Sequence, residues 1–268
     1  MTRLVVLGLV LASQFIALSY SQTNPSEQLQ VQPPFVRPSY EPGPNATAKE
    51  LEERGDILRE EKSFFEALDM YRAAIAKEPH SAKLYNKAGM TELQAEHLRS
   101  SIHYFERAIK LDPKFAAAHN NLGAAHYEER KYRSAIKEYK KAIKLEPDDA
   151  SYYSNLGAVY FSKKQWENAN KAYAQAVILD PDIFERTSRH GIAAQMSSPE
   201  DRAHFQFVLA GLYAKGGNMD RALLCLRRAM EGGYKNINSV YKDDEFANLR
   251  KDPRFAELMA NPPKALPN

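Results

Sequence analysis

Glycine, proline, alanine and aromatic residues recur through the middle of the chain at a constant spacing of 34 residues. Five columns hold this register across four successive units, each keeping one residue type or a close relative. The columns are Gly55, Gly89, Gly123 and Gly157; Pro79, Pro113, Pro147 and Pro181; Ala74, Ala108, Ala142 and Ala176; Tyr71, Phe105, Tyr139 and Tyr173; and Ala67, Ser101, Ala135 and Ala169. A fixed period of this length is typical of stacked supersecondary units, so the chain is predicted to be a repeat protein.

Each unit has the length and the periodicity of two helices. In the second half of the third unit, apolar residues recur at the spacing of one helical face: Ala135, Tyr139, Ala142 and Ile143. The proline that recurs in each unit ends the second helix, because it lacks an amide donor and disfavours helix in the residue before it. Ser81 and Asp148 are the predicted N-caps of the helices that follow.

This pattern resembles the tetratricopeptide repeat (TPR). The family's order of aromatic, Leu-Gly, Tyr, Ala, aromatic and Pro is met at Tyr153, Leu156, Gly157, Tyr160, Ala169, Tyr173 and Pro181. The resemblance covers four units, 48–81, 82–115, 116–149 and 150–183, and implies an all-α, right-handed α-solenoid of helix-turn-helix units. Polar residues stand in its apolar columns at Arg54, Glu92, His119 and His126, where the histidines are predicted to be core residues rather than metal ligands.

A fifth, degenerate unit over 203–234 follows the fourth by one repeat plus an insertion, 184–202. Its matching residues are Tyr213, Ala222, Leu226 and Ala229. Ser198-Pro199 is a predicted helix start, Gly216-Gly217 and Gly232-Gly233 are predicted helix stops, and 184–197 is a predicted loop. Residues 235–268 form a predicted C-terminal helical cap and tail, in which Phe246, Leu249, Phe255 and Leu258 cover the last unit.

The first 47 residues form two segments outside the repeats. Residues 1–21 combine Arg3, a short apolar run and small residues before the predicted cut after Ser21, as a secretory signal peptide does. An uncleaved inner-membrane anchor over 4–20 is the alternative. Residues 22–47 are rich in proline and form a predicted linker, with an isolated glycosylation-type match at Asn45. We therefore expect an exported protein of bacterial type, periplasmic or secreted, with no membrane insertion after cleavage.

The composition and the absence of known motifs argue against catalysis and against nucleic-acid binding. The net charge is only +3, and the basic stripe of Arg133, Lys137, Lys140 and Lys144 is interpreted as a solvated outer face diluted by acids such as Glu138. No metalloprotease, nucleophile-elbow or phosphate-loop motif occurs, so no catalytic residue, metal, cofactor or small-molecule substrate is predicted. The single cysteine, Cys225, is interpreted as a buried residue, with an intermolecular disulfide as the alternative.

The resemblance implies that the first helix of each unit lines a concave groove. The expected partner-binding residues are Asn86, Met90, Leu93, Asn120, Asn121, Tyr127, Ser154, Asn155 and Phe161. The expected groove is charged at one end, through Glu52, Asp56 and Arg59, and apolar at the other, through Phe207, Gly211 and Ala214. Chaperone-docking members of the family bind a terminal carboxylate with lysine, but Asn86 and Asn120 stand at that place here.

Two functions remain open from the sequence. The favoured one is a non-enzymatic protein-protein interaction module of the cell envelope, which binds an extended peptide or a helix of another protein in the groove. The alternative is a structural subunit of an envelope assembly, such as secretion, pilus or outer-membrane machinery, that docks through its convex face and the insertion.

Overall fold

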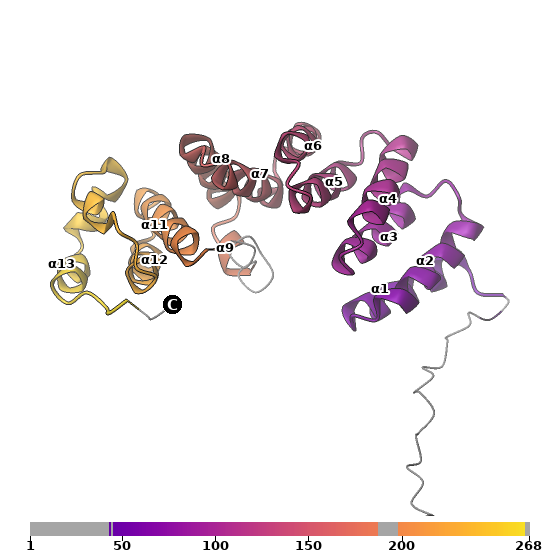
Figure 1. Ribbon diagram of the computed structural model, residues 1–268, viewed down its shortest axis with the longest axis horizontal. Helices are drawn as coiled ribbons and strands as arrows, with labels where there is room; N and C mark the ends of the chain where they lie inside the picture. The colour runs from indigo at the N-terminus through magenta and orange to yellow at the C-terminus, as the bar shows by residue number, and fades with distance from the viewer. Residues whose placement is uncertain (1–42, 44, 187–197, 266–268) are drawn as a thin grey trace, which may run out of the picture. The chain divides into compact units, whose positions relative to one another are not determined.

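The computed structural model describes residues 43, 45–186 and 198–265, and these ranges contain helices and turns but no β-strand. The helices of the four predicted units form consecutive pairs (Figure 1). The pairs are α1 (Ala48–Glu60) with α2 (Phe64–Lys77), α3 (Ala82–Gln94) with α4 (Leu98–Leu111), α5 (Ala116–Glu128) with α6 (Tyr132–Leu145), and α7 (Ala150–Ser162) with α8 (Trp166–Leu179). Each second helix also contacts the next first helix, so the predicted all-α solenoid is confirmed. The predicted signal peptide and most of the linker lie outside the described residues.

The repeated glycines and aromatic residues bring the two helices of each pair together. A Cβ atom added to Gly157 would lie 2.5 Å from the ring of Tyr173, and the same contact recurs in the other three pairs. The aromatic column of Tyr71, Phe105, Tyr139 and Tyr173 is buried throughout. Helix crossing at this distance therefore requires both a residue without a side chain and a flat ring beneath it.

The helix ends follow the predicted signals with one correction. The second helices end two residues before each repeated proline, and the side chain of Ser198 accepts a hydrogen bond from the Asp201 amide at the start of α11. The N-cap of α7 is Asp149 and not the predicted Asp148, because the Asp149 carboxylate accepts from the Ser151 amide at 2.8 Å. Ser81 precedes α3 as predicted, although its hydroxyl makes no capping hydrogen bond.

The fifth pair, α11 (Pro199–Lys215) and α12 (Met219–Glu231), packs on α8 with a reversed direction. The ring of His204, near the start of α11, lies 4.5 Å from Trp166 at the start of α8. At the other end, the hydroxyl of Tyr213 donates to the carbonyl of Pro181, just after α8. Each earlier second helix is instead followed by a first helix that runs back along it.

The long connection between α8 and α11 permits this reversal. It contains α9 (Ile183–Arg186) and residues 187–197, which lie outside the described part of the chain. Between earlier pairs a short turn starts the next helix beside the last residues of the previous one, so the two helices run in opposite directions. The expectation that Phe207, Gly211 and Ala214 extend the groove is therefore wrong, since α11 runs the opposite way from α7 and its Gly211 face is covered by Glu245 and Phe246.

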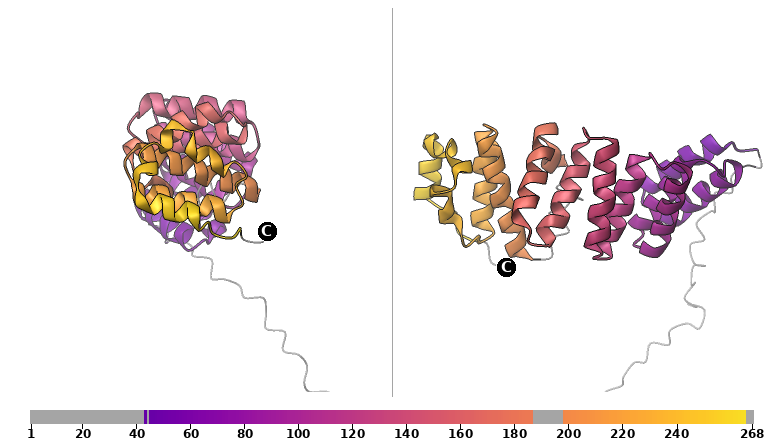
Figure 2. Two further views of the ribbon diagram at one scale, coloured as in Figure 1. Left: turned by 90° about the vertical axis from the view of Figure 1, so that its left-hand side faces the viewer. Right: turned by 90° about the horizontal axis from the view of Figure 1, so that it is seen from above.

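The C-terminal segment closes the fifth pair. It comprises the 3-10 turns η2 (Ile237–Tyr241), η3 (Asp244–Phe246) and η4 (Leu249–Lys251) and the helix α13 (Pro253–Ala260), so the expected capping helices include only one α-helix. The four residues predicted to cover the last unit, Phe246, Leu249, Phe255 and Leu258, are all buried. The helical pairs and this cap follow one another in chain order (Figure 2).

Candidate partner-binding surface

The first helix α5 contacts both α3 and α7, and this places most of the predicted binding residues on one continuous surface. The described residues of this surface do not all have the same access to solvent. Asn120, Asn121, Asn155, Met90, Leu93 and Tyr127 are partly exposed, whereas Asn86, Ser154 and Phe161 are buried. The exposed members come from three different units, so a ligand lying along them would contact several repeats at once.

Four asparagines form a hydrogen-bonded ladder across these helices. The Nδ2 of Asn121 donates to Oδ1 of Asn86 at 3.0 Å, and Nδ2 of Asn155 donates to Oδ1 of Asn120 at 2.9 Å. A third bond at 3.3 Å joins Nδ2 of Asn120 to Oδ1 of Asn121. Each inter-helix bond links a residue to the one 35 positions later, so it crosses one unit boundary. The amides are thus held in fixed orientations by their neighbours.

Phe161 has a different environment from the one expected. It is 3% exposed, and its ring packs against Trp166 at 4.9 Å and against His204 and Phe205 of α11. The reversed α11 therefore occupies the space into which this side chain was expected to project. Phe161 stabilises the junction between the fourth and fifth pairs and offers no surface to a partner.

Tyr127 and Glu128 lie at the C-terminal end of α5 on the same surface. The hydroxyls of Tyr127 and Ser162 are hydrogen-bonded at 2.8 Å, which is another contact between residues 35 positions apart. Burial raises the pKa of Tyr127, so it stays a neutral hydrogen-bonding group. Burial and the nearby charge of Glu96 raise the pKa of Glu128. This end of the surface disfavours additional negative charge.

An ion-paired cluster occupies the other end of the surface, between α1 and α3. Lys87 Nζ lies 2.5 Å from both Glu52 Oε1 and Asp56 Oδ2, and Lys83 Nζ lies 2.7 Å from the same Glu52 oxygen. Burial opposes ionisation of Glu52 and Asp56, but the hydrogen bonds that they accept outweigh it, and the pKa of each carboxyl lies below its ordinary value. The predicted charged end therefore exists, but its charges are largely paired with one another.

Lys83, Lys87 and Ser162 belong to this surface and were not predicted from the sequence. Lys87 stands in the same column as Asn121 and Asn155, and it pairs with Glu52 across 35 residues as they pair with Asn86 and Asn120. The signal that could have found Lys87 and Ser162 is this step of one repeat plus one residue, whereas Lys83 lies only 31 residues from Glu52 and follows no such step. The step becomes visible only when polar residues in adjacent columns are compared across unit boundaries.

The remaining candidate groups have structural roles. His119 is buried, with Nδ1 2.7 Å from Glu138 Oε2, so Glu138 faces inward and does not dilute the basic stripe as expected. The stripe residues Arg133, Lys137, Lys140 and Lys144 are all exposed. Cys225 is 2% exposed and burial raises its pKa to about 12, which leaves its thiol without access to another chain. The described residues contain no cluster of three or more His, Cys, Asp or Glu that could hold a metal ion.

Comparison with known families decides the nature of the repeats. A family model described as "TPR repeat" matches residues 100–130 and 128–164, and one described as "Tetratricopeptide repeat" matches residues 150–183. The chain contains tetratricopeptide repeats. Neither matching model represents a catalytic family, and no curated protein matches the chain. Among the described helices of this TPR protein, none combines the length and apolarity needed to cross a membrane.

Several solved structures resemble this TPR protein. One is described as "Crystal structure of MamA"; it is 22% identical, has a TM-score of 0.47, and the match covers 69% of this chain and 96% of that one. Another is described as "Crystal structure of MamA protein"; it is 21% identical, has a TM-score of 0.48, and the match covers 74% of this chain and 95% of that one. A third is described as "First TPR of Spaghetti (RPAP3) bound to HSP90 peptide SRMEEVD"; it is 20% identical, has a TM-score of 0.43, and the match covers 44% of this chain and 94% of that one.

Proposed function

We propose that this TPR protein is a non-catalytic adaptor that binds an extended segment of another protein along the surface formed by α3, α5 and α7. The amide ladder carries the proposal. It brings several hydrogen-bonding side chains into line along the direction in which the units stack, at a surface that solvent reaches. Tetratricopeptide repeats act in protein-protein contact, which agrees with this assignment.

The ladder leaves hydrogen-bonding capacity for a ligand. A carboxamide has two N–H donors and two acceptor lone pairs, and the ladder uses only one donor each of Asn120, Asn121 and Asn155. A peptide backbone can pair with the remaining donors and acceptors whatever its side chains are. Because the ladder already fixes the side-chain rotamers, binding costs less conformational entropy than it would with free asparagines.

The proposed site lies in an exported protein. Arg3, the apolar run that follows and the small residues before Gln22 support a cleaved signal peptide, and the partner is then a protein of the cell envelope. Sequencing the N-terminus of protein purified from its native cells should find Gln22 or an immediate neighbour. Protein that begins at Met1 or Thr2 and stays with the membrane would support the anchor instead.

Site-specific photo-crosslinking tests the binding surface. A photoreactive residue replaces Ala124, which is partly exposed on α5, or Lys137 on the outer face of α6 as a matched control. We expect one partner to crosslink from position 124 and not from position 137. Crosslinking from position 137 alone would place the binding site on the outer face.

Substitutions then measure the contribution of the ladder to binding of that partner. Losing one amide contact costs about 1–3 kcal/mol, or about 5- to 150-fold in affinity. Asn120→Ala combined with Tyr127→Ala should therefore weaken binding by at least tenfold while the helical circular-dichroism signal is retained. Lys137→Glu combined with Lys144→Glu should leave the affinity nearly unchanged. The reverse result would favour an assembly subunit that docks through its outer face.

A further inference from the structure

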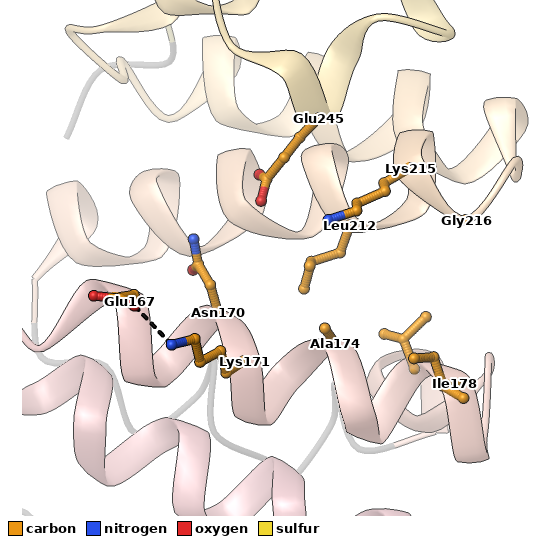
Figure 3. A pocket seen from close by; sticks show the side chains of 10 residues that line it. Glu167, Asn170, Lys171, Ala174, Ile178, Leu212, Lys215, Gly216 and Glu245 are labelled. Carbon is orange, nitrogen blue, oxygen red and sulfur yellow. Dashed lines mark hydrogen bonds and ion pairs between the residues drawn. The ribbon is translucent and has the colours of Figure 1, made fainter.

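A cleft opens between α8 and the reversed α11. It has a volume of about 520 Å³ and is bordered by aliphatic side chains from both helices, with Glu245 of η3 above them (Figure 3). The aliphatic residues are Ala174, Val177, Ile178 and Leu212. The two helices contact each other near their starts, where His204 packs on Trp166, and near their ends, where the Tyr213 hydroxyl donates to the carbonyl of Pro181.

The sequence of α8 departs from the earlier units on the face that lines this cleft. Ile178 stands one repeat after Lys144 and two repeats after Lys110, and Ala174 stands one repeat after Lys140. The corresponding positions of α4 and α6 are exposed and charged. Ile178 is 72% exposed, so most of this aliphatic side chain is open to solvent beside the cleft. Two charged positions of the outer stripe in α6, Lys140 and Lys144, thus become the apolar Ala174 and Ile178 in α8, and both of these line the cleft.

A second cavity of about 580 Å³ lies beside the cleft, and Asn170 and Glu245 border both. The second cavity is bordered by the aromatic side chains of Trp166, Phe207 and Tyr234. Together the two cavities border α8 from its first residue to its last turn. Two adjacent cavities along one helix fit an extended chain better than a compact small molecule.

Polar groups with unused hydrogen-bonding capacity face the cleft. The Oδ1 atom of Asn170 is buried and has no hydrogen-bond partner, so it lacks an N–H donor such as a peptide amide supplies. Within the described residues, Lys215 and Glu245 form no ion pair or hydrogen bond, and Figure 3 shows both directed into the cleft. Lys171 is already paired with Glu167 at 2.6 Å, so the free positive charge in the cleft is that of Lys215.

We infer that this cleft is a second binding site, distinct from the α3–α5–α7 surface, for an extended partner segment that inserts an aliphatic side chain between Ile178 and Leu212 and presents an acidic group to Lys215. The aliphatic side chain covers the exposed part of Ile178, and a backbone N–H satisfies Asn170. The acidic group pairs with Lys215. The chemistry of the site thus specifies a segment in which an aliphatic residue is followed or preceded by Asp or Glu.

Selection from a displayed library of random 12-residue peptides on the full-length protein tests this inference. We expect enriched peptides to share an aliphatic residue close to an acidic one, and we would measure the affinity of synthetic copies by fluorescence anisotropy. Ile178→Lys restores the residue type found at this position in α4 and α6, so the helix should fold normally. It should weaken binding at least tenfold, whereas Lys144→Ile, at the equivalent position of α6, should leave it unchanged.

Charge reversal gives an independent readout. Lys215→Glu should weaken binding of the acidic peptides at least tenfold, and replacing the peptide's acidic residue with Lys should restore binding to that variant. The groove variant Asn120→Ala with Tyr127→Ala should bind these peptides as tightly as the wild type, which separates this site from the proposed adaptor function. The inference is overturned if no peptide is enriched, or if every enriched peptide is insensitive to Ile178→Lys. It is also overturned if the wild type self-associates through the cleft and Ile178→Lys makes it monomeric.

Discussion

One residue in each turn between paired helices holds a left-handed backbone conformation. Lys62, Glu96, Arg130 and Lys164 have φ values of 61°, 63°, 58° and 56°, and they lie one repeat apart. Gly217 takes this place in the fifth pair, with φ of 81°. Residues with a Cβ atom pay for this conformation in steric strain, whereas glycine adopts it freely. The four units therefore keep a small strain that the fifth pair lacks.

Relieving this strain should stabilise the protein. We expect Lys164→Gly to raise the free energy of unfolding by about 0.5–1 kcal/mol, because the gain at a left-handed residue exceeds the added entropy of the unfolded chain. The adjacent Lys163→Gly is a matched control, since φ there is −85° and glycine should lower stability. Urea denaturation measures both, and equal losses for the two variants would contradict the prediction.

The contact between Gly157 and Tyr173 makes an opposite prediction. Gly157→Ala places a Cβ atom 2.5 Å from a ring that is fully buried, so we expect a loss of about 1–3 kcal/mol of unfolding free energy. In a Tyr173→Leu background the smaller side chain gives the new methyl group room. The same glycine substitution should then cost clearly less, and a double-mutant cycle by urea denaturation checks this.

At the scale of helices, the sequence predicted where each helix lies along the chain far better than which way each pair runs against its neighbour. The columns of small and aromatic residues record how two helices of one pair pack, and they located every pair, including α11 with α12. The fifth pair matches these columns at Tyr213, Ala222 and Leu226 although it is reversed. Contacts within a pair do not depend on how the pair lies on its neighbour. The direction of α11 is decided by the connection before it, whose sequence has no period.

The candidate surface on α3, α5 and α7 was predicted in part for a similar reason. The first-helix columns correctly place Asn86, Asn120, Asn121 and Asn155 together, because residues one repeat apart are structurally equivalent. Their mutual hydrogen bonds were not foreseen, since these join different columns. The burial of Phe161 depends on α11 and could not follow from the fourth unit alone.

His204 gives the junction of α8 and α11 a dependence on pH. Burial lowers the pKa of His204, against the weaker opposing effect of Asp201 and Glu200, so the folded state favours the neutral ring. The unfolded chain then binds more protons than the folded one between the two pKa values. The contribution of the neutral His204 ring to the free energy of unfolding is therefore fully present above the unfolded histidine pKa of about 6.5. It is lost as the pH falls below that value toward the lower pKa of the folded state. Tm measured from pH 7.5 to 5 should fall less in His204→Phe than in the wild type; parallel curves would contradict this.

On the scale of the whole repeat array, the C-terminal segment protects the last pair from solvent. Phe246 packs on Phe207 at a ring distance of 5.0 Å, and both are buried. An array of repeats exposes the apolar face of its terminal unit unless something covers it. Here 3-10 turns and α13 provide that cover.

Truncation after Gly233 should therefore lower both the Tm and the solubility of the protein, because Phe207 and its neighbours lose their cover. Removal of residues 262–268 alone is the control and should leave the Tm unchanged, since no buried residue is described there. Thermal unfolding followed by circular dichroism measures both variants. An unchanged Tm after the longer truncation would show that the segment is only an appendage.

The rungs of the amide ladder have a consequence for how such a chain can grow. Each rung joins a residue to one 35 positions later, so the acceptor belongs to one unit and the donor to the next. Duplication of residues 116–149 would supply both halves of a new rung and lengthen the array without a mismatch. The fifth pair has no such freedom, because the C-terminal segment already covers it and a copied unit placed there would have to displace that cover. Gene duplication can thus extend this protein from within, whereas its C-terminal end is closed to further growth.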